Sequence, residues 1–285
     1  MDASNSIKID ELKEKMYTYS SDEFEGRGTP SKGQQLAVEY LVDHYKNLGI
    51  PSVKNDSYLQ GVPLQLEDKP NISLNISNQK FVYYQDYISY ANGLDRNYES
   101  VEIIFAGYGI DDPAYSDYLN IDVKNKIVVA IGGEPLDENE NYFINGNSKS
   151  KWSNSREEIG LKKSIAKNKG AQALILVDDY LFRRYKSDFQ YSDSGRGEKR
   201  MTLGNDEENN FQVLLFSEKH KSFFSRESLS LNMTFNKNIQ SFTADNVAAI
   251  IKGSEFPNEY IILTAHLDHV LPYNGKIYNG ADDNG

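Results

Sequence analysis

Cysteine is absent from the sequence. A chain without cysteine can form neither disulfides nor thiolate zinc sites, and it cannot use a cysteine nucleophile. Cytoplasmic and bacterial envelope proteins both tolerate this composition, so the cysteine count leaves the compartment open.

Long apolar runs and basic clusters are also missing. No stretch of about 18 apolar residues could span a bilayer. The polar start Met1–Ser4 lacks the apolar core of a secretory signal, so we expect any native signal to have been removed. Lys and Arg number 31 against 42 Asp and Glu, which gives a formal net charge of -11. Nucleic acid and anionic membrane surfaces are therefore poor partner candidates.

What the sequence does contain is enough apolar material for a large core. The chain has 285 residues, of which 39% are hydrophobic. This size suits one large domain or two domains of ordinary size.

Two helices are predicted near the start of the chain. Apolar residues at spacings of three and four predict an amphipathic helix over residues 7–19. Ser31 and Gln34 form a capping-box pattern ahead of a second apolar stripe, which predicts a helix over 32–48 that Gly49 would end.

The middle of the chain has the pattern of a small α/β or β-rich module. Short alternating runs predict strands between 52 and 98, and a helix is expected over 156–168. Longer apolar runs predict buried strands at 101–106, 126–131, 173–177 and 213–216. The polar stretch 187–210 is expected to be a mobile surface loop, because it offers little apolar area to offset the entropy of ordering.

Two further apolar runs lie near the end of the chain, at 246–251 and 260–265. A polar, proline-containing loop joins them, so we expect them to pair as core strands.

The residues after the second run carry the strongest chemical pattern. In an extended chain His266 and Asp268 would lie on the same side, so that the carboxylate could orient the imidazole as in carboxylate–histidine–metal sites. Asp282 and Asp283 add oxygen ligands, and one carboxylate can bridge two metal ions. Taken singly, these fragments more often form a core histidine and a polar turn. Their joint occurrence after one apolar run favours a two-metal hydrolytic centre.

The same residues resemble the signature of the co-catalytic zinc aminopeptidase family, which includes bacterial leucyl aminopeptidases and glutamate carboxypeptidase-like proteins. The matching stretches are Ala265–His269 and Asn279–Asn284. Phe24–Gly28 and 33–49 are similar to that family's N-terminal segment, and 105–110, 117–118 and 122–129 are similar to its protease-associated insert.

The resemblance implies a role for each matching residue. His266 would be a terminal zinc ligand, Asp268 the acid that orients it, and Asp283 the bridge between two zinc ions. His269 and Asp282 match without an assigned role. In the complete enzyme, two zinc ions would hold the water that attacks a peptide with a free N-terminus, while a glutamate moves the proton.

The family's remaining ligands and its general-base glutamate would all follow Gly285. We therefore expect a chain truncated within its metal-site motif, with zinc absent or only partly bound and no peptide hydrolysis.

The expected fold is α/β. It combines part of a zinc-peptidase α/β sandwich, with a central mixed sheet and flanking helices, and an inserted β-rich protease-associated domain. Residues 1–98 and 226–285 would form the incomplete peptidase domain, and 99–225 the insert. The expected partner is a peptide substrate, with no nucleic acid and no membrane span, and self-association through the incomplete sheet is a further expectation. The resemblance implies a secreted, periplasmic or cell-envelope location.

A second interpretation stays open, in which the chain is a non-catalytic protein that acts through its protease-associated module as a binding or lid domain.

His44 and His220 lie apart from the motif and are expected to have ordinary surface or packing roles. Lys162, Lys163 and Lys167 predict a solvated helix face.

Overall fold

The structure is a computed structural model that describes residues 7–54, 56–91, 95–154, 157–194, 200–204 and 211–283. The chain divides into two compact units: unit 1 comprises Met1–Gln65 with Ser241–Gly285, and unit 2 comprises Leu66–Gln240. This division is discontinuous like the predicted one, but residues 66–98 and 226–240 lie in unit 2. Which unit corresponds to a peptidase part and which to a protease-associated insert stays a prediction.

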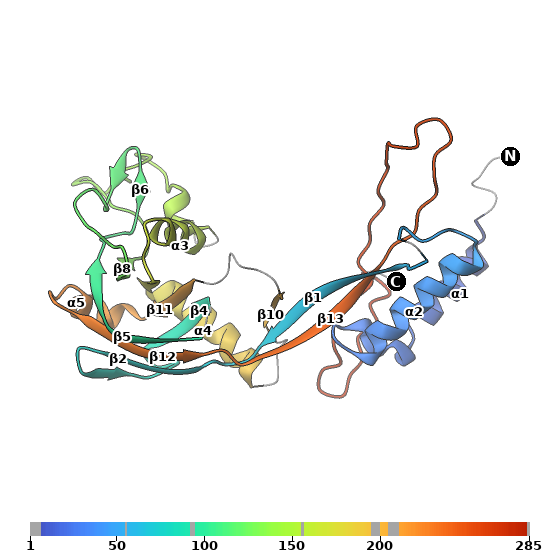
Figure 1. The fold of residues 1–285 in the computed structure, drawn as a ribbon, viewed down its shortest axis with the longest axis horizontal. Coiled ribbons are helices and arrows are strands. Elements are labelled where there is room, and N and C mark those ends of the chain that lie inside the picture. The colour runs from blue at the N-terminus through green and yellow to red at the C-terminus, as the bar shows by residue number, and fades with distance from the viewer. Residues whose placement is uncertain are drawn as a thin grey trace. The chain divides into compact units, whose positions relative to one another are not determined.

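Unit 1 begins with the two predicted helices (Figure 1). The sequence had predicted them over 7–19 and 32–48, and α2 has the predicted N-cap, since the Ser31 hydroxyl accepts a hydrogen bond from the Gln34 N–H at 3.1 Å. Two long strands, β1 and β13, are neighbours in one sheet and continue across the boundary between the units. The elements are α1 (Ile9–Tyr19), the 3₁₀ helix η2 (Asp22–Arg27), α2 (Lys32–Asn47), β1 (Leu59–Glu67) and β13 (Ile239–Val247).

The prediction that 246–251 and 260–265 pair as core strands is wrong, although the first two residues of the first run, Asn246 and Val247, end strand β13. Within the described residues no helix or strand follows β13, and Figure 1 shows a long loop there. The first run makes isolated backbone hydrogen bonds, from Ala248 N–H to Tyr58 and from Ile250 N–H to Pro51. The second run is exposed, with Ile261 at 95%. An apolar run becomes a buried strand only where neighbouring strands and covering side chains are available, and the described residues of unit 1 supply neither around this run.

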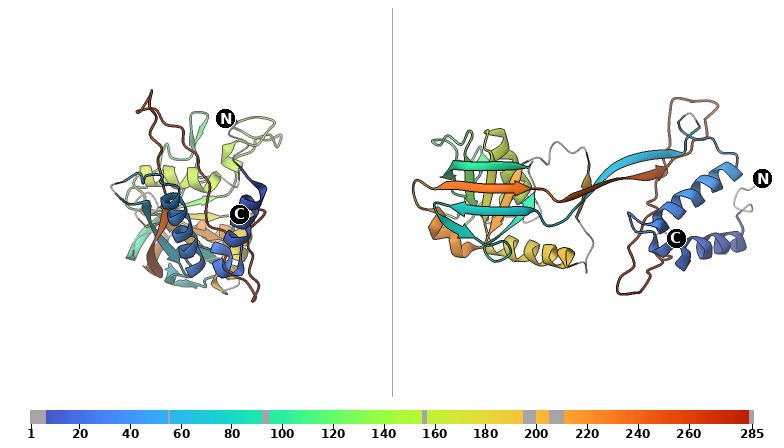
Figure 2. Two further views of the ribbon diagram at one scale, coloured as in Figure 1. Left: turned by 90° about the vertical axis from the view of Figure 1, so that its right-hand side faces the viewer. Right: turned by 60° about the horizontal axis from the view of Figure 1, so that its bottom comes forward.

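Unit 2 is built on an eight-stranded sheet with the order β3-β2-β12-β5-β8-β9-β11-β4. Its centre is parallel, because β5, β8, β9 and β11 pair in the same direction, whereas β12, β2, β3 and β4 pair antiparallel at the flanks. Several of these strands run side by side in the right-hand view of Figure 2. The α/β class is therefore confirmed, with a mixed sheet and flanking helices. The strands of the sheet are β2 (Asn71–Ile76), β3 (Gln79–Phe81), β4 (Tyr87–Ala91), β5 (Arg96–Phe105), β8 (Ile127–Ile131), β9 (Ala173–Val177), β11 (Gln212–Phe216) and β12 (Ser230–Asn236).

Smaller elements and helices complete unit 2. The helices α3 and α4 connect successive parallel strands, as expected for a parallel sheet. These elements are β6 (Asp111–Asp112), β7 (Tyr115–Ser116), η3 (Lys151–Ser153), α3 (Glu158–Asn168), α4 (Asp179–Asp193), β10 (Arg200–Leu203), η5 (Glu218–His220) and α5 (Lys221–Phe224). None of the helices in the described ranges is long and apolar enough to cross a membrane.

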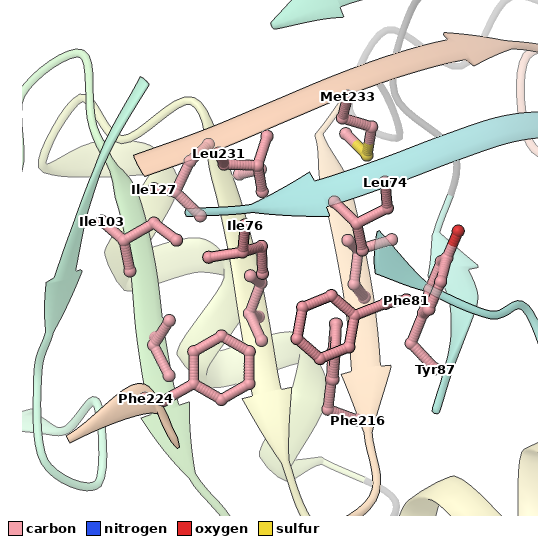
Figure 3. Close-up of a cluster of buried hydrophobic side chains, with 14 of the residues drawn as sticks. Leu74, Ile76, Phe81, Tyr87, Ile103, Ile127, Phe216, Phe224, Leu231 and Met233 are labelled. Atoms are coloured by element: carbon pink, nitrogen blue, oxygen red, sulfur yellow. The ribbon is translucent and has the colours of Figure 1, made fainter. Parts of the chain in front are cut away.

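Both faces of the sheet in unit 2 are buried, which explains why its strands read as continuous apolar runs. Successive residues of β8 alternate between two clusters: Ile127 lies in one cluster and Val128 in the other. The first cluster also receives Leu74 from β2 and Phe216 from β11, as Figure 3 shows. The second is covered by side chains from α3 and α4.

The predicted strands of the middle segment are confirmed, with β9 matching 173–177 and β11 covering 213–216. The prediction of a mobile loop over 187–210 is wrong at Arg200–Leu203, which form strand β10, and at its start, because residues up to Asp193 continue α4. Phe189 buries its ring there and the Asp178 side chain caps the helix, so the helix has more support than the polar composition suggested. Residues 195–199 and 205–210 of the expected loop lie outside the described residues.

The predicted solvated lysine face on α3 is also wrong at one position. Lys162 is fully buried and forms an ion pair with Glu158 at 2.7 Å. Its ammonium group also donates hydrogen bonds to the carbonyls of Ile131 and Gly133 at 2.9 and 2.8 Å. Burial lowers the pKa of Lys162, and the charge of Glu158 opposes that effect. The pair anchors α3 to the carboxyl end of β8.

Candidate metal centre

His266 and Asp268 lie in unit 1 on the loop that follows the exposed run 260–265. The Nδ1 atom of His266 is 2.9 Å from the backbone carbonyl of Asp268 and 3.7 Å from its Oδ1. The imidazole is thus held mainly by the backbone, with the carboxylate close by. Both side chains are largely exposed, at 61% and 47%.

Asp283 approaches His269, a residue to which the sequence assigned no role. Its Oδ2 atom lies 3.1 Å from Nδ1 of His269. The imidazole of His269 is the more enclosed of the two, with its side chain 20% exposed against 53% for Asp283. His269 belongs to the first stretch of the motif and Asp283, fourteen positions later, to the second. The structure therefore brings these two stretches into contact.

The donor types at this place suit zinc, because imidazole nitrogen and carboxylate oxygen are both common zinc ligands. The number of donors is smaller than a closed site needs. Within the described ranges, which leave out five short segments between residues 7 and 283, no three or more His, Cys, Asp or Glu side chains gather so that they could hold a metal ion. A catalytic zinc has three protein ligands as a rule. These residues do not form a complete metal site within the described part of the chain, and no chemical step through a metal follows from them alone.

Arg27, at the end of η2, contacts both loops that carry the motif. Its side chain is fully buried. The guanidinium donates hydrogen bonds to the carbonyls of Leu267 at 3.1 Å and Asn279 at 2.8 Å, and a longer one to Gly280 at 3.4 Å. A further bond reaches the carbonyl of Tyr19 at 2.8 Å. One side chain therefore joins the end of α1 to both loops of the motif.

Two other polar side chains strengthen this connection. The Tyr19 hydroxyl donates to the Leu267 carbonyl at 3.1 Å. The amide of Asn279 donates to the backbone carbonyl of Ser20 at 2.8 Å and to Asp22 Oδ1 at 2.9 Å. The loops thus rest on the N-terminal segment through hydrogen bonds, beside a small apolar cluster of Tyr19, Phe24 and Ala37.

The sequence analysis placed Arg27 within Phe24–Gly28, a stretch that resembles the family's N-terminal segment, but assigned it no role. A signal was nevertheless present, since Arg27 lies between Gly26 and Gly28. Glycines on both sides of a long cation indicate that other backbone approaches closely at this point.

The remaining histidines have the ordinary surroundings that were expected. His220 packs its ring against Phe81, with centroids 5.1 Å apart, and lies 3.1 Å from Asp86 Oδ1. His44 lies on α2 with its ring 6.4 Å from that of Tyr45.

A cavity in unit 2 lies at the carboxyl ends of β8 and β9. It has a volume of ≈ 230 Å³. Carboxylates of Glu134, Asp178 and Glu218 line it together with Lys221. Asp178 and Glu134 are already engaged, the first as the cap of α4 and the second with Ser150 at 2.7 Å.

Comparison with known families connects the motif to a class of enzyme. Residues 246–285 match the family model of peptidase family M28. This segment contains His266, Asp268 and Asp283, so the resemblance expected from these residues is confirmed over the segment that carries them. No curated protein matches the chain.

Solved structures give distant matches. Two structures of the zinc aminopeptidase BSAP from Bacillus subtilis are similar at 14% and 12% identity, over 94% and 85% of this chain, with TM-scores of 0.35 and 0.33. The chain spans about half the length of these aminopeptidases, 53% and 47%. The psychrophilic subtilisin-like protease Apa1 from the Antarctic Pseudoalteromonas sp. AS-11 matches at 10% identity over 66% of this chain and 38% of its own, with a TM-score of 0.30.

Proposed function

Because the segment that matches peptidase family M28 also contains both predicted zinc ligands, we propose that this chain is part of a zinc-dependent peptidase. The reaction class is hydrolysis of a peptide bond. Removal of residues from a free N-terminus is the specific form that we propose, on the strength of the sequence resemblance. The family match over 246–285 is the observation that carries the proposal.

Each residue of the motif would have a different role in binding the metal. His266 and Asp283 would bind zinc, with Asp283 bridging two ions, and Asp268 would orient the imidazole of His266. The 2.9 Å contact between His266 and the Asp268 backbone supports a fixed ring orientation at that position. Zinc, when bound, supplies a water of lowered pKa for hydrolysis. His269 lies 3.1 Å from Asp283 and would hold that carboxylate in place.

We further propose that this chain on its own binds zinc weakly or not at all and hydrolyses no peptide. The ligand count supports this, because no group of three donors forms within the described residues. Two donors give zinc too little coordination energy to offset the loss of its hydration shell. A secreted or cell-envelope location is a further proposal that rests on the sequence resemblance alone.

The test uses the full-length product of the gene that encodes this chain, assayed on aminoacyl anilides and on the same compounds with an acetylated N-terminus. We expect hydrolysis of the free-amine substrates only, loss of activity with a chelator, and recovery with zinc. His266→Ala and Asp283→Asn should each reduce kcat by at least about a hundredfold, and the matched change His44→Ala should have little effect. Zinc-independent hydrolysis, or full activity in both motif variants, would contradict the proposal.

A second candidate function is that of a non-catalytic binding module. Unit 2 favours it, because this unit has an apolar core of its own and a cavity of ≈ 230 Å³. It would be preferred if the full-length product lacked activity and zinc while retaining affinity for a peptide. Mutation of the cavity residue Lys221 to Ala should then abolish that affinity.

A further inference from the structure

We propose that Arg27 is a positioning residue, which sets the relative placement of the two loops that carry the candidate zinc ligands before any metal is bound. The proposal rests on the proposed function in one respect, since it takes His266 and Asp283 as the ligands. Arg27 itself lies beneath the motif and would act through the loops.

The first argument is how the guanidinium distributes its donors. Nε binds the carbonyl of Leu267, between His266 and Asp268, whereas Nη1 binds that of Asn279, in the loop that leads to Asp283. The loops therefore share one rigid, planar group, and their separation is fixed by the geometry of that group. A hydrogen bond from the His269 N–H to the Arg27 carbonyl, at 3.3 Å, adds a backbone link.

The second argument is the backbone that presents Arg27. Arg27 has a φ of 61°, in the left-handed region that residues with a side chain rarely adopt. Such conformations persist where the surrounding structure over-determines them, and they cluster at functional sites. The loops approach the segment around Arg27 so closely that both the segment and a loop need a glycine at the contact. A Cβ on Gly28 would lie 2.5 Å from the Leu271 nitrogen, and one on Gly280 would lie 2.7 Å from Nη2 of Arg27.

The third argument is charge. Burial lowers the pKa of Arg27, whereas Tyr19, Asp268 and Asp283 raise it. Arginine stays protonated in proteins, so a buried positive charge lies within the field of two carboxylates of the motif. The guanidinium carbon also lies 4.5 Å from the centroid of the Tyr19 ring, within the range of a cation–π contact. The cation is thus compensated by the same residues that it helps to place.

These contacts imply that a lysine cannot replace Arg27. Lysine keeps the positive charge but concentrates its donors on one nitrogen, so it cannot reach the carbonyls of Leu267 and Asn279 with the same fixed separation. Arg27→Lys therefore separates the effect of geometry from that of charge. Arg27→Met removes both and provides the comparison.

The experiment uses the full-length product of the gene that encodes this chain and follows His44, His220, His266 and His269 by nuclear magnetic resonance, first without metal and then during a zinc titration. His44 reports the fold of unit 1 on α2, and His220 reports unit 2. Without metal, both Arg27 variants should shift the His266 and His269 signals and leave those of His44 and His220 in place. The matched change of an exposed arginine in unit 2, Arg226→Lys, should shift none of the motif signals.

The zinc titration supplies the second readout. The apparent zinc dissociation constant at the motif should rise by at least about tenfold in both Arg27 variants, as for other residues that orient metal ligands. Unchanged His266 and His269 signals in the metal-free variants would overturn the proposal. So would displacement of the His44 signal in both variants, because Arg27 would then support the fold of unit 1 in general. An unchanged dissociation constant in Arg27→Lys would overturn it too, because charge alone would then explain the effect.

The two hypotheses fail in different ways. If zinc perturbs neither His266 nor His269 in the unaltered full-length product, the proposed function fails, while the metal-free comparison still decides the role of Arg27.

Discussion

Similar apolar runs are buried in unit 2 and exposed to solvent in unit 1. In unit 2, Leu174–Leu176 lies in a central strand and is fully buried, with successive side chains on opposite faces of the sheet. In unit 1, Ile261–Leu263 has the same kind of composition but is 79% to 95% exposed. The difference shows that apolar composition alone does not make a strand. Neighbouring strands must accept its backbone hydrogen bonds, and other side chains must cover both of its faces.

The units also differ in what their buried charges do. In unit 2 the Lys162–Glu158 pair fastens a helix to an extensive apolar core. In unit 1 the apolar cluster is small, and Arg27 binds the two loops of the motif through hydrogen bonds to backbone carbonyls. We therefore expect unit 2 to respond mainly to changes in packing and buried charge, and the motif in unit 1 to respond to changes in polar contacts.

The largest expected effect on stability is in unit 2, from Glu158→Gln. This change leaves the buried ammonium of Lys162 without its ion-pair partner, which should cost about 3–5 kcal/mol of unfolding free energy. Urea unfolding followed by tryptophan fluorescence measures it, because Trp152 is the single tryptophan and is buried in unit 2. The adjacent exposed residue offers a matched control, Glu157→Gln. Equal effects of the two changes would contradict a structural role for the pair.

A pair of identical substitutions sharpens the comparison of apolar runs. Ile175→Ala, at a fully buried position of β9, should lower the unfolding free energy by about 2–5 kcal/mol. Ile261→Ala should change it by no more than about 0.5 kcal/mol, because that side chain is 95% exposed. Urea titrations followed by circular dichroism can compare them. A large loss from Ile261→Ala would show that the run 260–265 is packed in solution.

A smaller effect concerns acid stability in unit 2. Burial alone would raise the pKa of Asp86, but hydrogen bonds from Lys219, the Val82 N–H and His220 outweigh it and hold the pKa below its usual value. A lowered pKa in the folded state contributes stability that is present above the unfolded pKa of about 3.9 and is lost as pH falls through the folded pKa.

Asp86→Asn should therefore cost roughly 1.5–3 kcal/mol near pH 6 and make the remaining stability less sensitive to acid below about pH 4. Unfolding measured by Trp152 fluorescence over that range provides the check, with the exposed change Asp188→Asn as control. An unchanged slope of stability against pH in Asp86→Asn would count against this assignment.

Local sequence patterns predicted much of the fold. The cap at Ser31 and the apolar stripe after it predicted α2, and a continuous apolar run predicted β9. These elements depend on contacts near in sequence or on burial on both faces, and composition records both. The boundaries of the two units were harder to predict from the sequence, because β2 pairs with β12 and no local pattern specifies that partner.

The candidate site was predictable in its residue types and less so in its contacts. His266, Asp268 and Asp283 follow from the motif, but the approach of Asp283 to His269 depends on how two loops fold back. The buried Lys162 looked like a surface residue because helical spacing does not reveal which face is covered. Its partner four positions earlier, Glu158, was the available signal. Arg27 was missed because its partners are backbone carbonyls of residues distant in sequence.

The location of zinc in the full-length gene product tests the central claim most directly. Crystals measured on both sides of the zinc absorption edge should give the strongest anomalous peak about 2.0–2.2 Å from an imidazole nitrogen of His266 and a carboxylate oxygen of Asp283. Arg27 should keep its hydrogen bonds to the carbonyls of Leu267 and Asn279 in the same crystals. An ordered motif without zinc, or a strongest peak among the carboxylates of the unit 2 cavity, would contradict the account.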